Sequence, residues 1–198
     1  MNPGELRNRL AVMTLRGDAN NVYAWTPSRE TWGKVKYTGK IAVFAKTGVG
    51  ASGAEIMMRK SEITPYQMIR ADGEMFFITS IIPEGIHPIY HKISCALVEP
   101  VEAKVTRTES GMSKEGYPEN TEKEIITLPV VLTEKYLGNT DTDSHAENTR
   151  RLIAVTPREY KPEAGDRMEI SGETYRVEVI HDLNRYTYEV EIERVSDD

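Results

Sequence analysis

Short segments in which apolar and polar residues alternate run along almost the whole chain. They are rich in Ile, Val, Phe, Tyr and Thr, and Gly, Pro, Asp or Asn separate them. This pattern is typical of antiparallel strands that close into small barrels or sandwiches. Only GELRNRL near the start and residues 145–151 could form a helical turn or two. We therefore expect an all-β protein whose strands include RLAVMTL, TWGKVKYTG, AEIMMRK, QMIRA, EMFFITSII, IYHKISCALVEP, KEIITLPVVL, RRLIAVTP, RMEIS, ETYRVEVI and YTYEVEIERV.

One β-hairpin is predicted from the turn ADGE, in which Asp72 and Gly73 lie between two such segments. Glycine supplies the positive φ that a tight hairpin turn requires. The hairpin recurs downstream in RMEISGETYRVEVI, where Gly172 is 172 − 73 = 99 residues from Gly73, and Tyr175 matches Phe76. A second domain that is a diverged repeat of the first would explain this, as would two unrelated hairpins with similar turns.

The chain is long enough for one large or two small domains, with 198 residues of which 39% are apolar. The interval TRTESGMSKEGYPENTEKE, residues 106–124, is polar, lacks periodicity and contains several turn formers, so it predicts a long loop or linker. We expect two small antiparallel β-barrel or sandwich domains, at residues 1–100 and 124–198, joined by a linker at 101–123. Trp25 and Trp32 are expected to anchor the first core.

Charge is distributed unevenly along the chain. Residues 1–100 carry 12 Lys and Arg against 9 Asp and Glu, a net +3, and residues 101–198 carry 13 against 22, a net −9, which together give −6. Tight binding to a phosphate backbone needs clustered Lys and Arg, so the acidic balance argues against it. No segment has the roughly 18 apolar residues of a membrane span, and the N-terminus lacks the apolar core of a signal peptide. We expect synthesis in the cytosol and no membrane association.

A glycine-rich segment, GVGASG at residues 48–53, fits the spacing of a dinucleotide-binding loop and follows the apolar IAVFA. Such a loop must open a helix, whereas the next residues, AEIMMR, alternate as a strand does, and no βαβ unit is visible. The alternative is that residues 38–53 form a long loop between two strands. Loops of that length in small domains are often functional.

Other candidate sites lack the residues that their chemistry needs. His87 and His91 are four residues apart, but no nearby carboxylate or thiol completes a set of metal ligands. NTDTDSHAE, residues 139–147, resembles a calcium loop but lacks its glycine and closing glutamate, so a solvated acidic loop is expected. The single cysteine, Cys95, is predicted to be a buried thiol. We expect no enzyme activity, no cofactor and no metal site, and we interpret the alternating Glu189, Glu191 and Glu193 as a solvated strand face.

Residues 1 to about 100 resemble the head–tail joining proteins of long-tailed bacteriophages, also called head-closure or stopper proteins. The resemblance rests on the opening GELRNRLAVMT, the Trp of ETWGKVKY, the segment AEIMMRKSEITPYQMIRADGEMFFITSIIP and the strand ending ISCALVE. In that family a Trp-containing strand is followed by a long loop, an I-x-I-R strand, a Pro-led strand, a G-x-x-Y/F-x-I hairpin and a last strand that often ends in Cys. The order is the same here.

The resemblance implies a structural role in a virion neck, in an oligomeric ring that closes the DNA channel after packaging and docks the tail. Its partners would be the portal or adaptor ring, tail proteins and further copies of the chain, with transient non-specific contact to packaged DNA and assembly in the bacterial host cytoplasm. The family's long loop projects into the channel and corresponds to residues 38–53 here. The channel residues that this implies are Lys40, Lys46, Gly48, Gly50 and Gly53.

Two other functions stay open at this point. A tail-terminator or tail-completion protein would use a similar small β fold, and a nucleotide-binding enzyme would act through Gly48 to Gly53. The chain also departs from the family in its length, because typical members end near Pro100 and this chain continues with an acidic second half. That half is expected to reinforce the ring or to supply part of the face that docks the tail.

Overall fold

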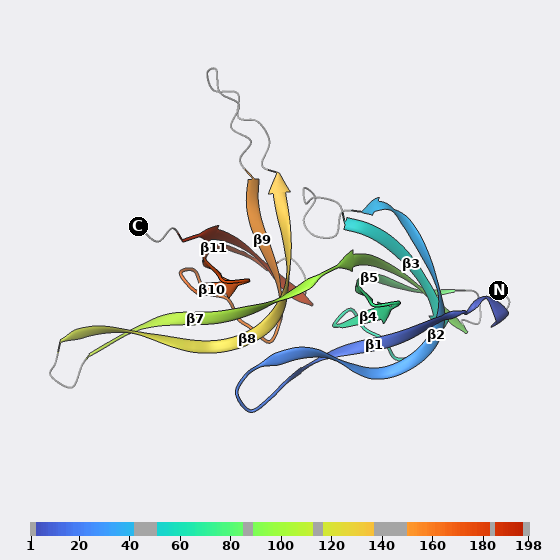
Figure 1. Cartoon of the computed structure of the whole chain (residues 1–198), viewed down its shortest axis with the longest axis horizontal. Coiled ribbons are helices and arrows are strands. Elements are labelled where there is room, and N and C mark those ends of the chain that lie inside the picture. Colours follow the sequence, from blue (N-terminus) through green and yellow to red (C-terminus); the bar gives the residue numbers. More distant parts are fainter. Residues whose placement is uncertain are drawn as a thin grey trace, which may run out of the picture. The chain divides into compact units, whose positions relative to one another are not determined.

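The computed structural model describes residues 3–41, 51–84, 89–112, 117–136, 150–182 and 185–195. Within them the chain forms one short 3₁₀ helix and twelve β-strands (Figure 1). Contacts divide the chain into two compact units, one of Met1–Arg16 with Trp25–Pro100 and one of Gly17–Ala24 with Val101–Asp198.

The first unit contains a closed antiparallel barrel with the strand order β1-β2-β3-β6-β5-β4. Alternation along each strand directs one set of side chains inward. The core contains Leu10, Val12, Ile56, Phe76, Ile78, Ile93 and Cys95, among others. The strands are β1 (Asn8–Gly17), β2 (Tyr23–Ile41), β3 (Ala51–Arg59), β4 (Gln67–Ala71), β5 (Glu74–Glu84) and β6 (Tyr90–Val98).

The second unit contains another closed antiparallel barrel, with the order β7-β8-β9-β12-β11-β10 when it is followed from β7. Its core includes Ala103, Val105, Leu128, Val130, Ala154, Met168, Val177 and Val190. The strands are β7 (Pro100–Met112), β8 (Pro118–Tyr136), β9 (Arg150–Pro157), β10 (Arg167–Ile170), β11 (Glu173–His181) and β12 (Thr187–Arg194). The predicted all-β fold with two small antiparallel barrels is therefore confirmed.

The two barrels have the same topology, because adding six to each strand number of the first order gives the second. The hairpin turns also match: φ is 52° at Asp72 and 87° at Gly73, and 53° at Ser171 and 82° at Gly172. Positive φ at both central residues is what a type I′ hairpin turn requires. A register shift follows in each barrel, between Ile78 and Ser80 and between Val177 and Val179. These shared features support a diverged repeat.

The predicted linker is wrong, because β7 and β8 occupy most of residues 101–123 and belong to the second barrel. The apolar periodicity is missing there for a physical reason. Residues 108–112 and 119–124 are exposed throughout, so neither face of these strand segments lies against a core. The predicted helical turn in GELRNRL is limited to a 3₁₀ turn at Pro3–Glu5, since β1 starts at Asn8.

The tryptophans do not anchor the first barrel's interior. Trp32 is 57% exposed on β2. Its neighbour Gly33 is the residue that faces inward, since a Cβ there would lie 2.3 Å from Leu10 Cδ1. Trp25 packs instead against a separate cluster of Ala11, Met13 and Met68. Ala11 and Met13 alternate with the core residues Leu10 and Val12, so this cluster covers the outer face of the first barrel.

Candidate functional site

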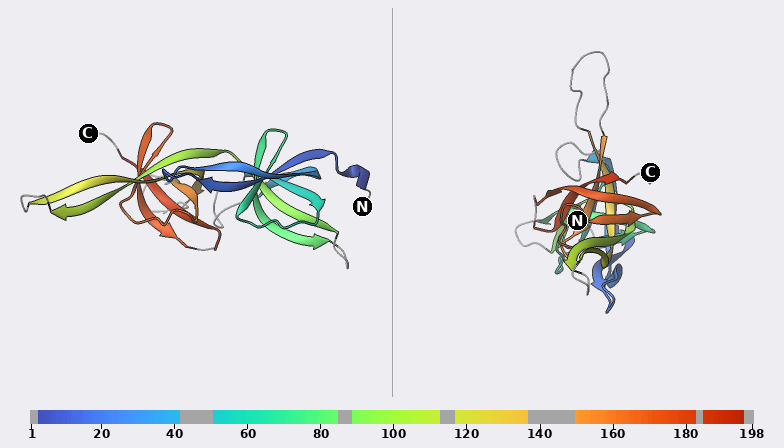
Figure 2. Two further views of the ribbon diagram at one scale, coloured as in Figure 1. Left: turned by 90° about the horizontal axis from the view of Figure 1, so that it is seen from below. Right: turned by 90° about the vertical axis from the view of Figure 1, so that its left-hand side faces the viewer.

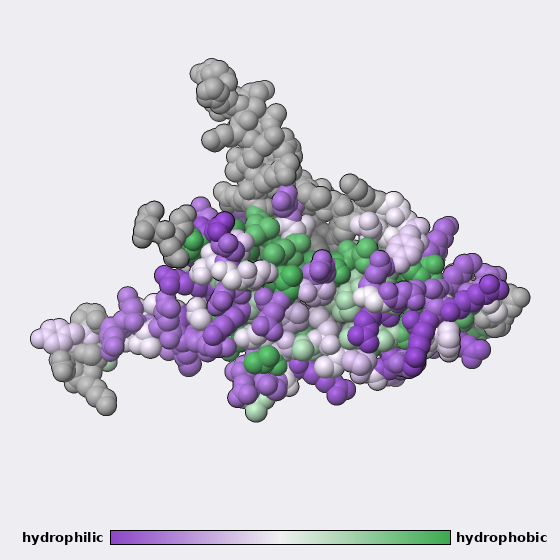
Figure 3. All heavy atoms as spheres, in the orientation of Figure 1, coloured by the Kyte–Doolittle hydropathy of each residue, from purple (hydrophilic) through white to green (hydrophobic). Residues whose placement is uncertain are grey.

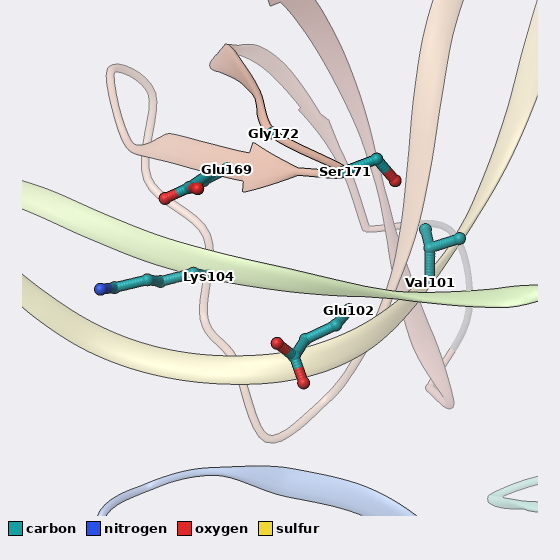
Figure 4. A pocket seen from close by; sticks show the side chains of 6 residues that line it. All are labelled: Val101, Glu102, Lys104, Glu169, Ser171 and Gly172. Carbon is teal, nitrogen blue, oxygen red and sulfur yellow. The ribbon is translucent and has the colours of Figure 1, made fainter.

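One open depression of about 410 Å³ lies on the outside of the second barrel (Figure 4). It is lined by Val101, Glu102 and Lys104 of β7, Glu169 of β10, and Ser171 and Gly172 of the turn. Lys104 and Glu169 are directly paired across the two strands, and their side chains extend in the same direction (Figure 4). Lys104 Nζ also lies 3.1 Å from Glu124 Oε2, and the hydrogen bond to Glu124 raises the pKa of Lys104. These residues form a solvated ion-pair surface, with no nucleophile placed beside a base.

The residues predicted to face a channel are only partly covered by the structure. Lys46, Gly48 and Gly50 lie outside the described residues. The backbone of Lys40 is in β2, opposite Ser52. Gly53 is buried in β3, between Thr38 of β2 and Ala96 of β6. The predicted loop at residues 38–53 is therefore too long at both ends, because both of its ends extend the β2–β3 ladder.

The residues after the glycine-rich segment form β3, Ala51–Arg59. A dinucleotide site would need a helix there, with its N-terminal amides directed at the pyrophosphate. The nucleotide-binding alternative therefore lacks its structural context.

The first barrel holds a buried histidine and a buried cysteine. His91 is 8% exposed on β6, and burial, followed by the charge of Lys60, lowers its pKa. Cys95 lies in the core, and burial raises the pKa of its thiol to about 12. Such a thiol is protonated at neutral pH and unreactive. His87 and residues 139–147 lie outside the described residues, and among the described residues no group of His, Cys, Asp or Glu could hold a metal ion.

The interpretation of β12 as a solvated acidic face is wrong for two of its three glutamates. Glu189 is 4% and Glu191 5% exposed, whereas Glu193 is exposed. Glu191 Oε1 lies 2.9 Å from His181 Nε2. Both glutamates point away from the barrel interior, since they alternate with the core residues Val190 and Ile192. The alternation of residues along β12 therefore predicted correctly which side of the strand the glutamates lie on, but not that two of them are buried.

A buried ionic cluster in the second barrel was not predicted from the sequence. Arg107 of β7 donates to both carboxylate oxygens of Asp166, from Nε at 2.7 Å and from Nη2 at 2.8 Å. Tyr160 Oη and the Glu163 amide also donate to Asp166. Burial alone would raise the pKa of Asp166, but the hydrogen bonds from Arg107 and Tyr160 outweigh it and lower the pKa. Because all of these groups bond to the Asp166 carboxylate, the cluster ties the segment before β10 to β7, and that carboxylate is not free to act as a base.

Two hairpins run past the barrels, and sequence analysis missed the role of both. The tip of the β1–β2 hairpin, Gly17–Ala24, belongs to the second unit. The β7–β8 hairpin continues beyond the last pairing of β7 with β10, Thr106 with Arg167, as an exposed two-stranded ribbon (Figures 1 and 2). We call residues 108–112 and 117–124 the distal ribbon. On the face shown in Figure 3 it is mainly hydrophilic.

The chain was compared with family models, curated proteins and solved structures. No family model matches the sequence, and no curated protein matches it. One similar solved structure is a chain from the virion of a native gene transfer agent particle, with 15% identity and a TM-score of 0.37. The match covers 46% of this chain and 96% of that one. No helix in the described part of the chain is long and apolar enough to cross a membrane.

Proposed function

We propose that this chain is a structural subunit of the neck of a tailed bacteriophage or prophage particle. In this proposal it forms part of the head–tail connector ring, which closes the DNA channel after packaging and docks the tail. The proposal places the chain in the general class of virion components, to which the similar chain of the gene transfer agent particle also belongs. Its partners are the portal or adaptor ring, tail proteins and further copies of itself.

The observation that carries the proposal is the position of the family-like motifs in the first barrel. Trp32 is on β2, the IMMR segment is on β3, the Gly73 turn joins β4 to β5, and Cys95 is on β6. These motifs lie on strands of one closed barrel, and their order along those strands is what supports the proposal.

The charge of the chain suits a component of a DNA channel. A net charge of −6 limits lasting attachment to DNA that must pass through. The first barrel's segment is the less acidic part, and its Lys40 and Lys46 are the residues that we propose to contact phosphates transiently. Gly53 is not among the residues proposed to face the channel, because it is buried in β3 and pairs with β6.

The test is to delete the gene from its phage and to examine the lysate by electron microscopy while quantifying packaged DNA. We expect heads that package DNA and then lose it, beside complete unattached tails, and we expect the intact gene supplied in trans to restore joined particles. DNA-filled heads with overlong or malformed tails would instead assign the chain to the tail terminus. Normal infectious particles would refute a role in the virion neck.

A further inference from the structure

The β1–β2 and β7–β8 hairpins hold the same place in the two barrels, as the first two strands of each order. Both hairpins continue past their own barrel (Figure 1). The tip of the first is packed within the second unit, while the distal ribbon is exposed. The contacts of the first tip therefore show how a hairpin in this position can dock.

The first tip docks on β8 through its backbone. The Thr127 amide donates to the Asn21 carbonyl at 3.1 Å, and Val22 forms a parallel bridge with Thr127. Asn21 Nδ2 donates to the Ile125 carbonyl at 3.5 Å. Tyr23 packs against the core cluster of the second barrel. The docked hairpin thus combines main-chain pairing with one aromatic anchor, as in peptide recognition by strand addition.

The distal ribbon also has an exposed two-stranded backbone and an exposed aromatic side chain, the two features by which the first tip docks. Strand β7 ends at Met112, and Tyr117 directly precedes β8; these two residues are 81% and 68% exposed. Ser110 Oγ donates to Asn120 Oδ1 at 2.8 Å across the ribbon. An isolated two-stranded ribbon gains little stability in water, and large apolar side chains at its end gain more when a partner covers them.

The repeat identifies the equivalent docking position in the first barrel. Ile81 and Ile180 are 180 − 81 = 99 residues apart, as the two turns are, and they pair with Ile93 and Val190. On the next strand these residues pair with Ile56 and Ala154. Ile56 pairs with Val35, and Ala154 with Leu132, so the offset between β2 and β8 is 132 − 35 = 97. Thr127 then corresponds to Glu30, and Ile125 to Ser28. Both Ser28 and Glu30 are exposed.

The edge of the strand is also comparable at these two positions. The β2–β3 ladder begins at Gly33 with Met58, and the β8–β9 ladder begins at Val131 with Val155. In the described residues, Ser28 and Glu30 therefore precede the β3 ladder, just as Ile125 and Thr127 precede the β9 ladder. The two positions therefore have the same place along their strands, although in the first barrel the intervening Arg29 donates to Ser61 Oγ and the Glu62 carbonyl.

Charge favours a contact between two copies. The distal ribbon carries Glu109, Glu119, Glu122 and Glu124 against Lys123, which gives 1 − 4 = −3, whereas residues 1–100 have a net charge of +3. Beside the docking position, Arg9 lies 2.6 Å from Glu30 and is 71% exposed. An acidic ribbon can share Arg9 with Glu30, and the opposite net charges of the ribbon and of residues 1–100 speed association.

We propose that the distal ribbon of one copy docks on β2 of the first barrel of a second copy, at Ser28 and Glu30. The contact joins different surfaces of the two copies, so it is heterologous and propagates from copy to copy; it gives a ring when the rotation between neighbours closes. In such a ring, the β1–β2 hairpin of each chain docks within that chain, and its β7–β8 hairpin docks on the neighbouring chain. The inference concerns how copies bind one another and does not depend on the particle in which they work.

Cysteine cross-linking of the full chain tests the contact, because Cys95 is buried and does not compete. A Tyr117→Cys variant mixed with a Glu30→Cys variant and a short bis-maleimide should give a covalent dimer, and the double variant should give a ladder of larger species. The experiment has one positive and one negative control. Val22→Cys with Thr127→Cys should link within one chain, and exposed Lys161→Cys mixed with Glu30→Cys should give only background.

The strength of the contact is measured by sedimentation of the unmodified chain. We expect oligomers whose mass rises with concentration, and at least about tenfold weaker association in a Met112→Lys/Tyr117→Lys variant with an unchanged circular dichroism spectrum. A native chain that stays monomeric would overturn the proposal. So would association that the two substitutions leave unchanged, or cross-linking at background level while the Val22–Thr127 link forms. These outcomes are independent of the gene deletion, which tests the function in the neck.

Discussion

The two barrels share a strand order, but different side chains fix the start of β4 in the first barrel and of β10 in the second. In the first barrel, Gln67 Oε1 accepts from the Thr64 amide at 3.0 Å, and Gln67 Nε2 donates to Thr14 at 3.2 Å. In the second, Asp166 accepts from the Glu163 amide and from Arg107. Gln67 and Asp166 are 166 − 67 = 99 residues apart, as the two turns are. A neutral anchor and an ionic anchor therefore support the same backbone.

The outer faces of the barrels have diverged further than the turns. Met13 pairs with Met68 in the first barrel, within the apolar cluster that Trp25 covers. At the same place in the second barrel, Thr106 pairs with Arg167, which forms an ion pair with Glu122. A barrel constrains its inward positions by packing, whereas its outer positions change with whatever covers them.

The side chains that fill the two barrel interiors differ in size at equivalent positions, and the differences compensate one another. Leu10 of the first barrel fills the space in front of Gly33. The corresponding residues of the second barrel, by the same strand pairings, are Ala103 and Val130, both buried in its core. In the first barrel the large side chain is on the first strand and faces a glycine on the second strand. In the second barrel the first strand has the smaller residue, Ala103, and the second strand has the larger one, Val130. Cores tolerate such exchanges when the total volume is conserved.

The largest difference is expected from removing the two anchors. Asp166→Ala leaves Arg107, Tyr160 and the Glu163 amide without their shared acceptor, so we expect the second barrel to lose about 3–5 kcal/mol. Gln67→Ala removes only neutral hydrogen bonds, and we expect the first barrel to lose about 1 kcal/mol.

Each barrel has its own probe for this measurement. Both tryptophans lie in the first unit, so urea unfolding followed by tryptophan fluorescence reports on the first barrel. Amide hydrogen exchange in residues 150–182 reports on the second. Equal losses in the two barrels would show that the ionic cluster is no more important than its neutral counterpart.

A smaller effect is expected from placing a side chain at Gly33. A Cβ there would lie 2.3 Å from Leu10 Cδ1 and 2.8 Å from the Met57 carbonyl oxygen. We expect Gly33→Ala to destabilise the first barrel by about 1–3 kcal/mol through overpacking. Its cost should be lower in a Leu10→Ala background, as a double-mutant cycle of urea unfolding would show. Strict additivity would contradict the proposed exchange of volume.

The two turns should respond alike. Gly73 and Gly172 have φ of 87° and 82°, and at neither position would a Cβ meet another atom within 4 Å. The cost of Gly73→Ala or Gly172→Ala is therefore backbone strain alone, about 1–2 kcal/mol in each barrel. The same two probes measure it. A clear inequality would mean that the turns, despite equal dihedral angles, differ in how they support their barrels.

The smallest expected effect is a difference in acid sensitivity. His91 has a pKa below 6.5 in the folded chain because it is buried, so unfolding takes up a proton and the first barrel loses stability as the pH falls below about 6.5. The pKa of Asp166 is below 3.8, so its contribution to the second barrel is lost only as the pH falls below that value. His91→Leu should reduce the change in urea midpoint of the first barrel between pH 7 and pH 5. An unchanged pH dependence in that variant would refute this assignment.

Local patterns in the sequence were sufficient for the hairpins and the fold class. Gly73 and Gly172, each between alternating segments, indicate tight hairpin turns because glycine has no Cβ to oppose positive φ. Alternation likewise separates Leu10 and Val12, which face the core, from Ala11 and Met13, which do not. These features depend on neighbours within a few residues.

Pairings over long distances were decided only by the tertiary structure. Asp166 and Arg107 are 59 residues apart, and nothing near either residue in the chain identifies the other. The burial of Glu189 and Glu191 depends on what lies over the outside of a strand, which a period of two does not encode. Residues 108–112 and 119–124 have no apolar period because both faces of these strand segments are exposed to solvent, and a linker has the same polar composition. Strand ladders and barrel closure bring distant residues together, so only the folded chain separates these alternatives.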